Sequence, residues 1–171
     1  MQEFDTATVQ KFLRPLYQDL DGVSRAGDAE RVARIARALH PRPSTSLELL
    51  LAFHLLGSWL DKVGNLSRTA LNTGIREAEL RQTAASIRQL HAPLTEEERA
   101  VAGAILIDGA GVRGLAEKFA RSRREGHPVA DVAREALSET NVPEWMSEEA
   151  REMLVRRRAQ RDPFARAVLE G

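Results

Sequence analysis

The chain has 171 residues, and its 25 basic and 25 acidic side chains give a formal net charge of zero. A hydrophobic fraction of 43% and a charged fraction of 29% are typical of a globular protein and exclude the composition of a disordered chain. The length predicts a single domain, 1–171, with a substantial hydrophobic core. The neutral balance argues against a nucleic-acid partner, because dedicated nucleic-acid binders usually carry a basic excess.

The chain contains no cysteine, which excludes disulfides, thiolate nucleophiles and cysteine zinc sites. Its longest apolar stretch, 47–60, contains Glu48, His54 and Ser58 and is too short and too polar to span a bilayer. No basic and apolar leader opens the sequence. We therefore expect a cytoplasmic protein with no membrane partner.

The composition predicts an all-α fold, because Ala, Leu, Arg and Glu dominate and no alternating strand pattern occurs. Apolar residues at helical spacing predict a first helix over 6–20, kinked at Pro15. We expect Asp28 to cap the next helix, which ends before the prolines of 40–43.

The middle of the chain predicts the most buried helix. We expect Ser46 to cap a nearly all-apolar helix over 47–63, in which Trp59 belongs to the core. Gly64 follows that helix as a C-terminal glycine, and the polar segment 65–74 is expected to be a connection.

The second half predicts further helices separated by small residues. One runs over 75–90, and the next begins with a capping box at Thr95. The glycine-rich segment 108–111 is expected to be a turn before a helix over 112–124, either a tight helix–helix corner or, less well matched, a phosphate loop. The charged segment 147–161 predicts the last helix.

Four residues are candidate metal ligands: His54, Asp61, His91 and Asp108. His54 and Asp61 are seven residues apart and share a helix face, His91 ends a later helix, and Asp108 follows an apolar run. Imidazole and carboxylate groups suit zinc, manganese or iron, although only the fold can bring these residues together. The alternative for His54 is a core histidine with its hydrogen bonds satisfied.

Arginines form a second group of candidates. Arg113, Arg121 and Arg124 are candidates for binding phosphate, because guanidinium groups match phosphate oxygens. The alternative is a solvated helix face held by local ion pairs.

Three segments resemble the HD-domain superfamily of helical metal-dependent phosphohydrolases. Residues 28–36 read Asp-Ala-Glu-Arg-Val-Ala-Arg-Ile-Ala, 49–57 read Leu-Leu-Leu-Ala-Phe-His-Leu-Leu-Gly, and 107–115 read Ile-Asp-Gly-Ala-Gly-Val-Arg-Gly-Leu. They follow the order of that family's opening aspartate and histidine, its Leu-rich His-Asp helix and its closing aspartate segment. Residues 146–158 are similar to the closing helix of one branch. The resemblance implies a single-domain helical bundle of HD type, with its core at about 28–158.

The resemblance also implies an incomplete metal site. The family's ligands are a histidine, a His-Asp pair and an aspartate, and the matching positions here hold Arg31, His54, Leu55, and Asp108 or Ala110. Leu55 cannot bind a metal, and Arg31 places a fixed cation at a ligand position. We expect Arg31 to pair with Asp108 and Leu55 to fill the vacated space.

These observations predict a non-catalytic HD-like domain without a cofactor. It would bind a protein partner, a second copy of the chain or a phosphate-bearing, nucleotide-like ligand. One alternative is an active phosphohydrolase with a divalent metal on His54, Asp61, His91 and Asp108. The other is an unrelated helical structural or regulatory module.

Overall fold

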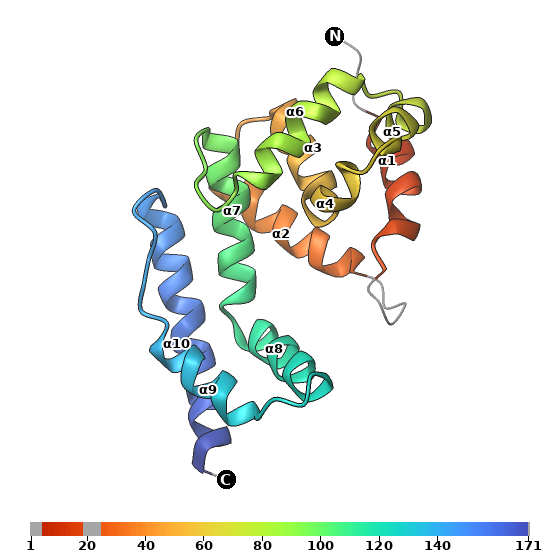
Figure 1. Ribbon diagram of the computed structural model, residues 1–171. Coiled ribbons are helices and arrows are strands. Elements are labelled where there is room, and N and C mark those ends of the chain that lie inside the picture. Colours follow the sequence, from red (N-terminus) through yellow and green to blue (C-terminus); the bar gives the residue numbers. More distant parts are fainter. Residues whose placement is uncertain (1–4, 19–24, 171) are drawn as a thin grey trace. The chain divides into compact units, whose positions relative to one another are not determined.

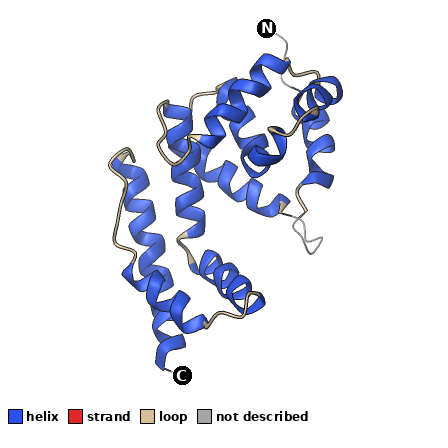
Figure 2. Cartoon of the chain, viewed as in Figure 1, coloured by secondary structure: helices blue, strands red, loops and turns tan. Residues whose placement is uncertain are grey.

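The structure is a computed structural model that describes residues 5–18 and 25–170 (Figure 1). Within these residues every regular element is a helix (Figure 2), which confirms the predicted all-α class. No helix in the described ranges is long and apolar enough to cross a membrane. The chain divides into two compact units, Met1–Ala102 and Gly103–Gly171, each with its own hydrophobic core.

The first unit consists of short helices around one core. In chain order they are α1 (Thr6–Leu13), η1 (Arg14–Leu16), α2 (Ala26–Leu39), α3 (Thr45–Phe53), η2 (His54–Leu56), α4 (Gly57–Leu60), α5 (Asn65–Thr73) and α6 (Glu77–Arg88). Its core joins Phe53, Leu60 and Leu80, which are all fully buried, with neighbours from α1 and α6. Trp59 packs against this core, and its ring lies 6.5 Å from that of Phe12, so the predicted core position of Trp59 is confirmed.

The apolar segment after Ser44 is as buried as predicted, but it is not one helix. The side chain of Ser44, not Ser46, accepts the capping hydrogen bond, from the Leu47 amide at 3.3 Å. The predicted helix over 47–63 is wrong, because α3 ends at Phe53 and a 3-10 turn leads into α4. A Cβ added to Gly57 would lie 2.5 Å from Cγ2 of Ile87, so the turn brings the α4 backbone close against α6.

Three further expectations for the first unit are corrected. Helix α1 ends at Leu13, and Pro15 sits in a separate 3-10 turn, since proline has no N–H to continue the helical hydrogen bonds. Residues 19 and 20 of that predicted helix lie outside the described residues. Helix α2 begins at Ala26, which places Asp28 in its first turn instead of at the cap. The predicted connection 65–74 is the helix α5.

Helix α5 forms despite its polar composition, because its packing outweighs weak helix propensity. Thr69 and Thr73 are buried, and Leu66 and Ala70 pack against the core. A glycine in the left-handed conformation lies at each end of the helix, Gly64 with φ 81° and Gly74 with φ 73°.

Helix α7 (Glu96–Gly109) begins in the first unit and ends in the second. The capping box is confirmed: Oγ1 of Thr95 accepts from the Glu98 amide at 3.2 Å, and the Glu98 carboxylate accepts from the Thr95 amide at 3.2 Å. The turn predicted from Asp108 starts later, since α7 includes Asp108 and Gly109.

The second unit packs α8 (Val112–Arg124), α9 (Val129–Ser138) and α10 (Glu148–Glu170) around a small core of Leu115, Ala133, Ala136 and Ala165. The tight corner predicted for the glycine-rich segment is present, because a Cβ on Gly114 would collide with the backbone of Gly109. Helix α10 continues past its predicted end at 161, through Pro163, because Ala165 is buried in the core.

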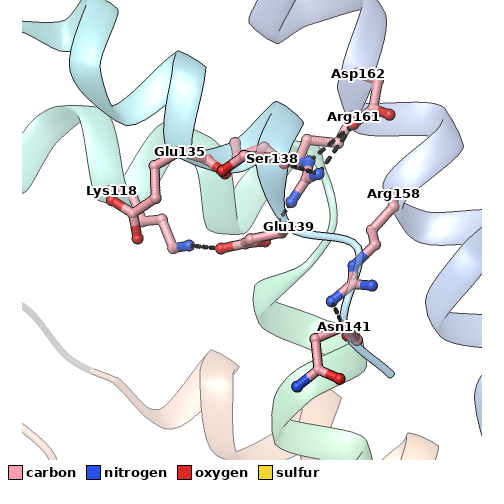
Figure 3. Close-up of polar contacts among 9 residues, drawn as sticks. Lys118, Glu135, Ser138, Glu139, Asn141, Arg158, Arg161 and Asp162 are labelled. Carbon is pink, nitrogen blue, oxygen red and sulfur yellow. Dashed lines mark hydrogen bonds and ion pairs between the residues drawn. The ribbon is translucent and has the colours of Figure 1, made fainter. Parts of the chain in front are cut away.

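A charge cluster around the buried Arg161, the Arg161 cluster, joins these three helices (Figure 3). Arg161 is 2% exposed and donates to Oε2 of Glu139 at 2.7 Å and to Oδ1 of Asp162 at 3.0 Å. Lys118 donates to the other oxygen of Glu139 at 2.7 Å. Burial opposes ionisation of Glu139, but these cations outweigh it and lower its pKa. Charge compensation inside a core this small gives the cluster a structural role.

Candidate functional site

The candidate site lies in the first unit and consists of His54, at the start of η2, and the charged residues at the start of α2. The charges of Arg25 and Asp28 are near enough to act on the His54 imidazole. Helices α2 and α3, which carry most of the segments 28–36 and 49–57 behind the HD resemblance, contact each other. The first turn of α2 supplies the charged groups, and the end of the most apolar helix supplies the histidine.

Asp28 is held by two arginines on the same side of α2. Nη2 of Arg31 donates to Oδ1 of Asp28 at 2.8 Å, and Nε of Arg25 donates to Oδ2 at 3.3 Å. Partial burial opposes ionisation of Asp28, but the hydrogen bonds from both arginines outweigh it and lower the pKa of the carboxyl group. Arg31 also donates to the carbonyl of Gly27 at 3.1 Å. Asp28 is thus a charged partner of arginines, not a helix cap.

His54 has one nitrogen engaged and one without a partner. Nδ1 lies 2.8 Å from the carbonyl oxygen of Leu51, which can only accept, so the proton sits on Nδ1. Nε2 is buried, has no hydrogen-bond partner, and carries the free lone pair. Burial lowers the pKa of His54 and keeps the ring neutral. Metal-binding histidines commonly donate one ring N–H to a carbonyl and bind the metal through the other nitrogen. His54 has the same tautomer and the same kind of hydrogen bond.

Tyr17 and Arg25 belong to the same neighbourhood, although the sequence did not single them out. The Tyr17 hydroxyl donates to the carbonyl of Ala52, and burial raises the pKa of Tyr17. The Arg25 amide donates to the Tyr17 carbonyl at 2.6 Å. The three-residue spacing of Arg25 and Asp28 was the available signal for their ion pair.

The residues around His54 do not fit a divalent metal ion. At two positions that the HD resemblance assigns to metal ligands, Arg31 has a positively charged side chain and the half-buried Leu55 has a side chain that cannot bind a metal. Across the described ranges, no group of three or more His, Asp or Glu side chains is placed to hold a metal ion. The His54 imidazole alone cannot form a metal site, because zinc sites in proteins use three or four protein ligands.

The other predicted ligands have local partners. Oδ2 of Asp61 accepts from Nη1 of Arg88 at 2.7 Å. His91 is exposed, and its Nδ1 lies 3.0 Å from the Arg88 carbonyl. Asp108 is half-buried near the end of α7 and belongs to the second unit, so the expected pair of Arg31 with Asp108 stays a prediction.

The arginines predicted to bind phosphate all lie on α8. Nε of Arg113 donates to Glu117 at 3.0 Å, one turn along the helix. Arg121 and Arg124 are exposed in the last turn, where cations interact favourably with the helix dipole. This arrangement matches the alternative of a solvated, ion-paired face.

No protein-family model matches this chain, and neither a curated protein nor a solved structure matches it. Two residues define the candidate site. They are Asp28, whose carboxylate accepts hydrogen bonds from two arginines, and His54, a neutral imidazole of which only Nδ1 has a hydrogen-bond partner.

Proposed function

We propose that this chain is an HD-like helical domain that has exchanged its metal site for an ion pair and acts by binding rather than by hydrolysis. The observation that carries the proposal is the Asp28–Arg31 ion pair, whose carboxylate acts electrostatically on His54. In the HD pattern an aspartate precedes a metal-binding histidine, and here that histidine position holds Arg31 at 2.8 Å from Asp28. A guanidinium contributes the positive charge that a bound cation would bring, without offering an open coordination position.

The same substitutions argue against hydrolysis. Metal-dependent phosphohydrolysis needs a metal to lower the pKa of a water molecule, and the His-Asp pair holds that metal. His54 keeps the ligand tautomer, while Leu55 supplies an apolar side chain where the pair needs a carboxylate. A retained histidine next to two replaced ligands is the pattern of a scaffold that has lost its metal.

Of the binding roles, a protein partner fits better than a phosphate-bearing ligand. Arg113 is paired along its own helix, and Arg25 and Arg31 are engaged with Asp28. In contrast, large apolar side chains of α10 are exposed, Val155 and Phe164 at 56% each. Exposed apolar groups among charges are typical of protein interaction surfaces.

The test restores the replaced ligands. We expect the double variant Arg31→His, Leu55→Asp to gain Mn²⁺ affinity of about tenfold or more over the unmodified chain, because it recreates the histidine and the His-Asp pair. Isothermal titration with Mn²⁺ measures the gain, and circular dichroism checks folding. If Leu55→Asp unfolds the protein, the single variant Arg31→His replaces the double variant in the test, and its affinity for Zn²⁺ is compared with that of the unmodified chain.

The matched control is Arg34→His, Leu55→Asp, which has the same composition but places the imidazole on the exposed Arg34 position of α2. We expect this control to bind Mn²⁺ no better than the unmodified chain. Equal affinity of the two double variants would overturn the proposal, as would tight Mn²⁺ binding by the unmodified chain.

A further inference from the structure

Helix α10 carries a stripe of exposed residues along one side, well away from its buried residues Leu154, Arg161 and Ala165. The stripe, called the outer stripe, contains Glu152, Val155, Ala159, Pro163 and Arg166. Steps of three and four residues keep these positions on one helix face. Figure 1 shows α10 as the long blue helix.

The outer stripe is symmetric about Ala159. Going outward from that residue, the next positions are apolar in both directions, Val155 and Pro163, four residues away. The ends carry opposite charges, Glu152 and Arg166, seven residues away in each direction. A stripe with this order is complementary to itself when two copies run antiparallel, since each acid then faces a base.

We propose that two copies of this chain associate through the outer stripe, with their α10 helices antiparallel and Ala159 at the two-fold axis. Each Val155 then lies opposite Pro163 of the other copy, and each Glu152 opposite Arg166. An isologous contact of this kind closes as a dimer, because the same patch is used on both sides. The inference rests on the binding role proposed above and names one partner for it.

The composition of the stripe sets the orientation and the strength. Ala159 has a small side chain, so the two helices can approach closely at the crossing point. A parallel pairing in register would place Glu152 against Glu152 and Arg166 against Arg166, and like charges in contact disfavour it. The contact is small compared with a standard interface of about 800 Å² per partner, so we expect a dimer in the micromolar range.

Sedimentation equilibrium of the full chain, over low to high micromolar concentrations, tests the inference. We expect Glu152→Arg and Arg166→Glu each to weaken dimerisation by about tenfold or more, because each creates two like-charge contacts. The matched control is Glu149→Arg, a charge reversal on the same exposed part of α10 but outside the stripe. We expect this control to dimerise like the unmodified chain.

An equimolar mixture of Glu152→Arg and Arg166→Glu provides the decisive arm. In the mixed dimer each new arginine meets a glutamate and each original glutamate meets an arginine, so we expect dimerisation to return to the unmodified level. A monomeric unmodified chain, unaffected single variants or an unrestored mixture would each overturn the inference. None of these outcomes touches the Mn²⁺ titration, so the two proposals fail separately.

Discussion

Nη2 of Arg31 lies 2.8 Å from Oδ1 of Asp28, one helical turn earlier on α2. The carboxylate of this pair acts electrostatically on His54, a neutral imidazole whose buried Nε2 has no hydrogen-bond partner. The pair gives the first unit a charge-compensated polar site with too few ligands for a metal ion. The consequences for stability are measurable.

Replacing Arg31 by Met removes the charge and keeps the apolar stem. We expect a loss of about 1–2 kcal/mol in the free energy of unfolding, because the partly buried Asp28 carboxylate loses its shortest hydrogen bond. Urea denaturation at neutral pH measures the loss. The control is Arg81→Met, whose ion pair with Glu77 is well exposed, and for it we expect less than about 0.5 kcal/mol. Equal losses for the two variants would contradict a special role for Arg31.

The stability of the first unit should depend on the protonation of His54. Its pKa in the folded state is lowered by burial, whereas the unfolded chain titrates near the ordinary histidine value of about 6.5. Below that value the unfolded state takes up a proton that the folded state resists, so stability falls as the pH decreases from neutral toward the lowered pKa. Denaturation curves at successive pH values measure this slope.

The variant His54→Asn separates His54 from the other histidines. The asparagine amide can still donate to the Leu51 carbonyl but does not titrate, so we expect a flatter pH dependence in the acid range. His91→Asn removes an exposed imidazole and controls for the loss of a histidine. If both variants keep the slope of the unmodified chain, His54 is not its source.

Neutralising Glu139 should weaken the second unit strongly. Glu139→Gln leaves the buried Arg161 with reduced charge compensation, and we expect a loss of about 3 kcal/mol. The double variant Glu139→Gln, Arg161→Met should recover part of this loss, since it removes the buried charge as well. Asp131→Asn, in a pair that is 62–64% exposed, is the control, with an expected change below about 0.5 kcal/mol. Chemical denaturation followed by circular dichroism distinguishes these outcomes.

Two glycines at the corner between α7 and α8 should respond oppositely to substitution. A Cβ on Gly114 meets the Gly109 backbone, which cannot rotate away, so we expect Gly114→Ala to cost about 3 kcal/mol or to prevent folding. A Cβ on Gly109 has no neighbouring atom within 4 Å, so we expect Gly109→Ala to leave the melting temperature unchanged or to raise it slightly. Similar melting temperatures for the two variants would show that the corner is not this tight.

The helices that the sequence predicted correctly have strong local signals. The Thr95 capping box and the helix from Val112 to Arg124 depend on residues close together in the chain. The helix α5 was missed because its stability comes from the burial of Thr69 and Thr73, which no local pattern reveals. The break at His54 was missed as well; close packing of Gly57 on Ile87 accompanies it, and no local pattern reveals that packing.

The candidate site was predictable only in part. The order of Asp28, Arg31 and His54 suggested that they belong together, and in the structure the Asp28 carboxylate acts electrostatically on His54. The lone pair on Nε2 depends on where the Leu51 carbonyl points, so it required coordinates. The symmetry of the outer stripe is present in the sequence, but which side of α10 is exposed depends on the packing of the second unit.

The central claim is that the Asp28–Arg31 ion pair replaces the metal of the HD-like site to which His54 belongs, so that the site does not support metal-dependent hydrolysis. The most direct measurement titrates the unmodified chain with Mn²⁺ and assays hydrolysis of p-nitrophenyl phosphate and nucleotides, beside the variant His54→Asn. We predict no stoichiometric Mn²⁺ binding and the same background hydrolysis in both proteins. One equivalent of Mn²⁺ with metal-dependent hydrolysis, both lost in His54→Asn, would contradict the claim.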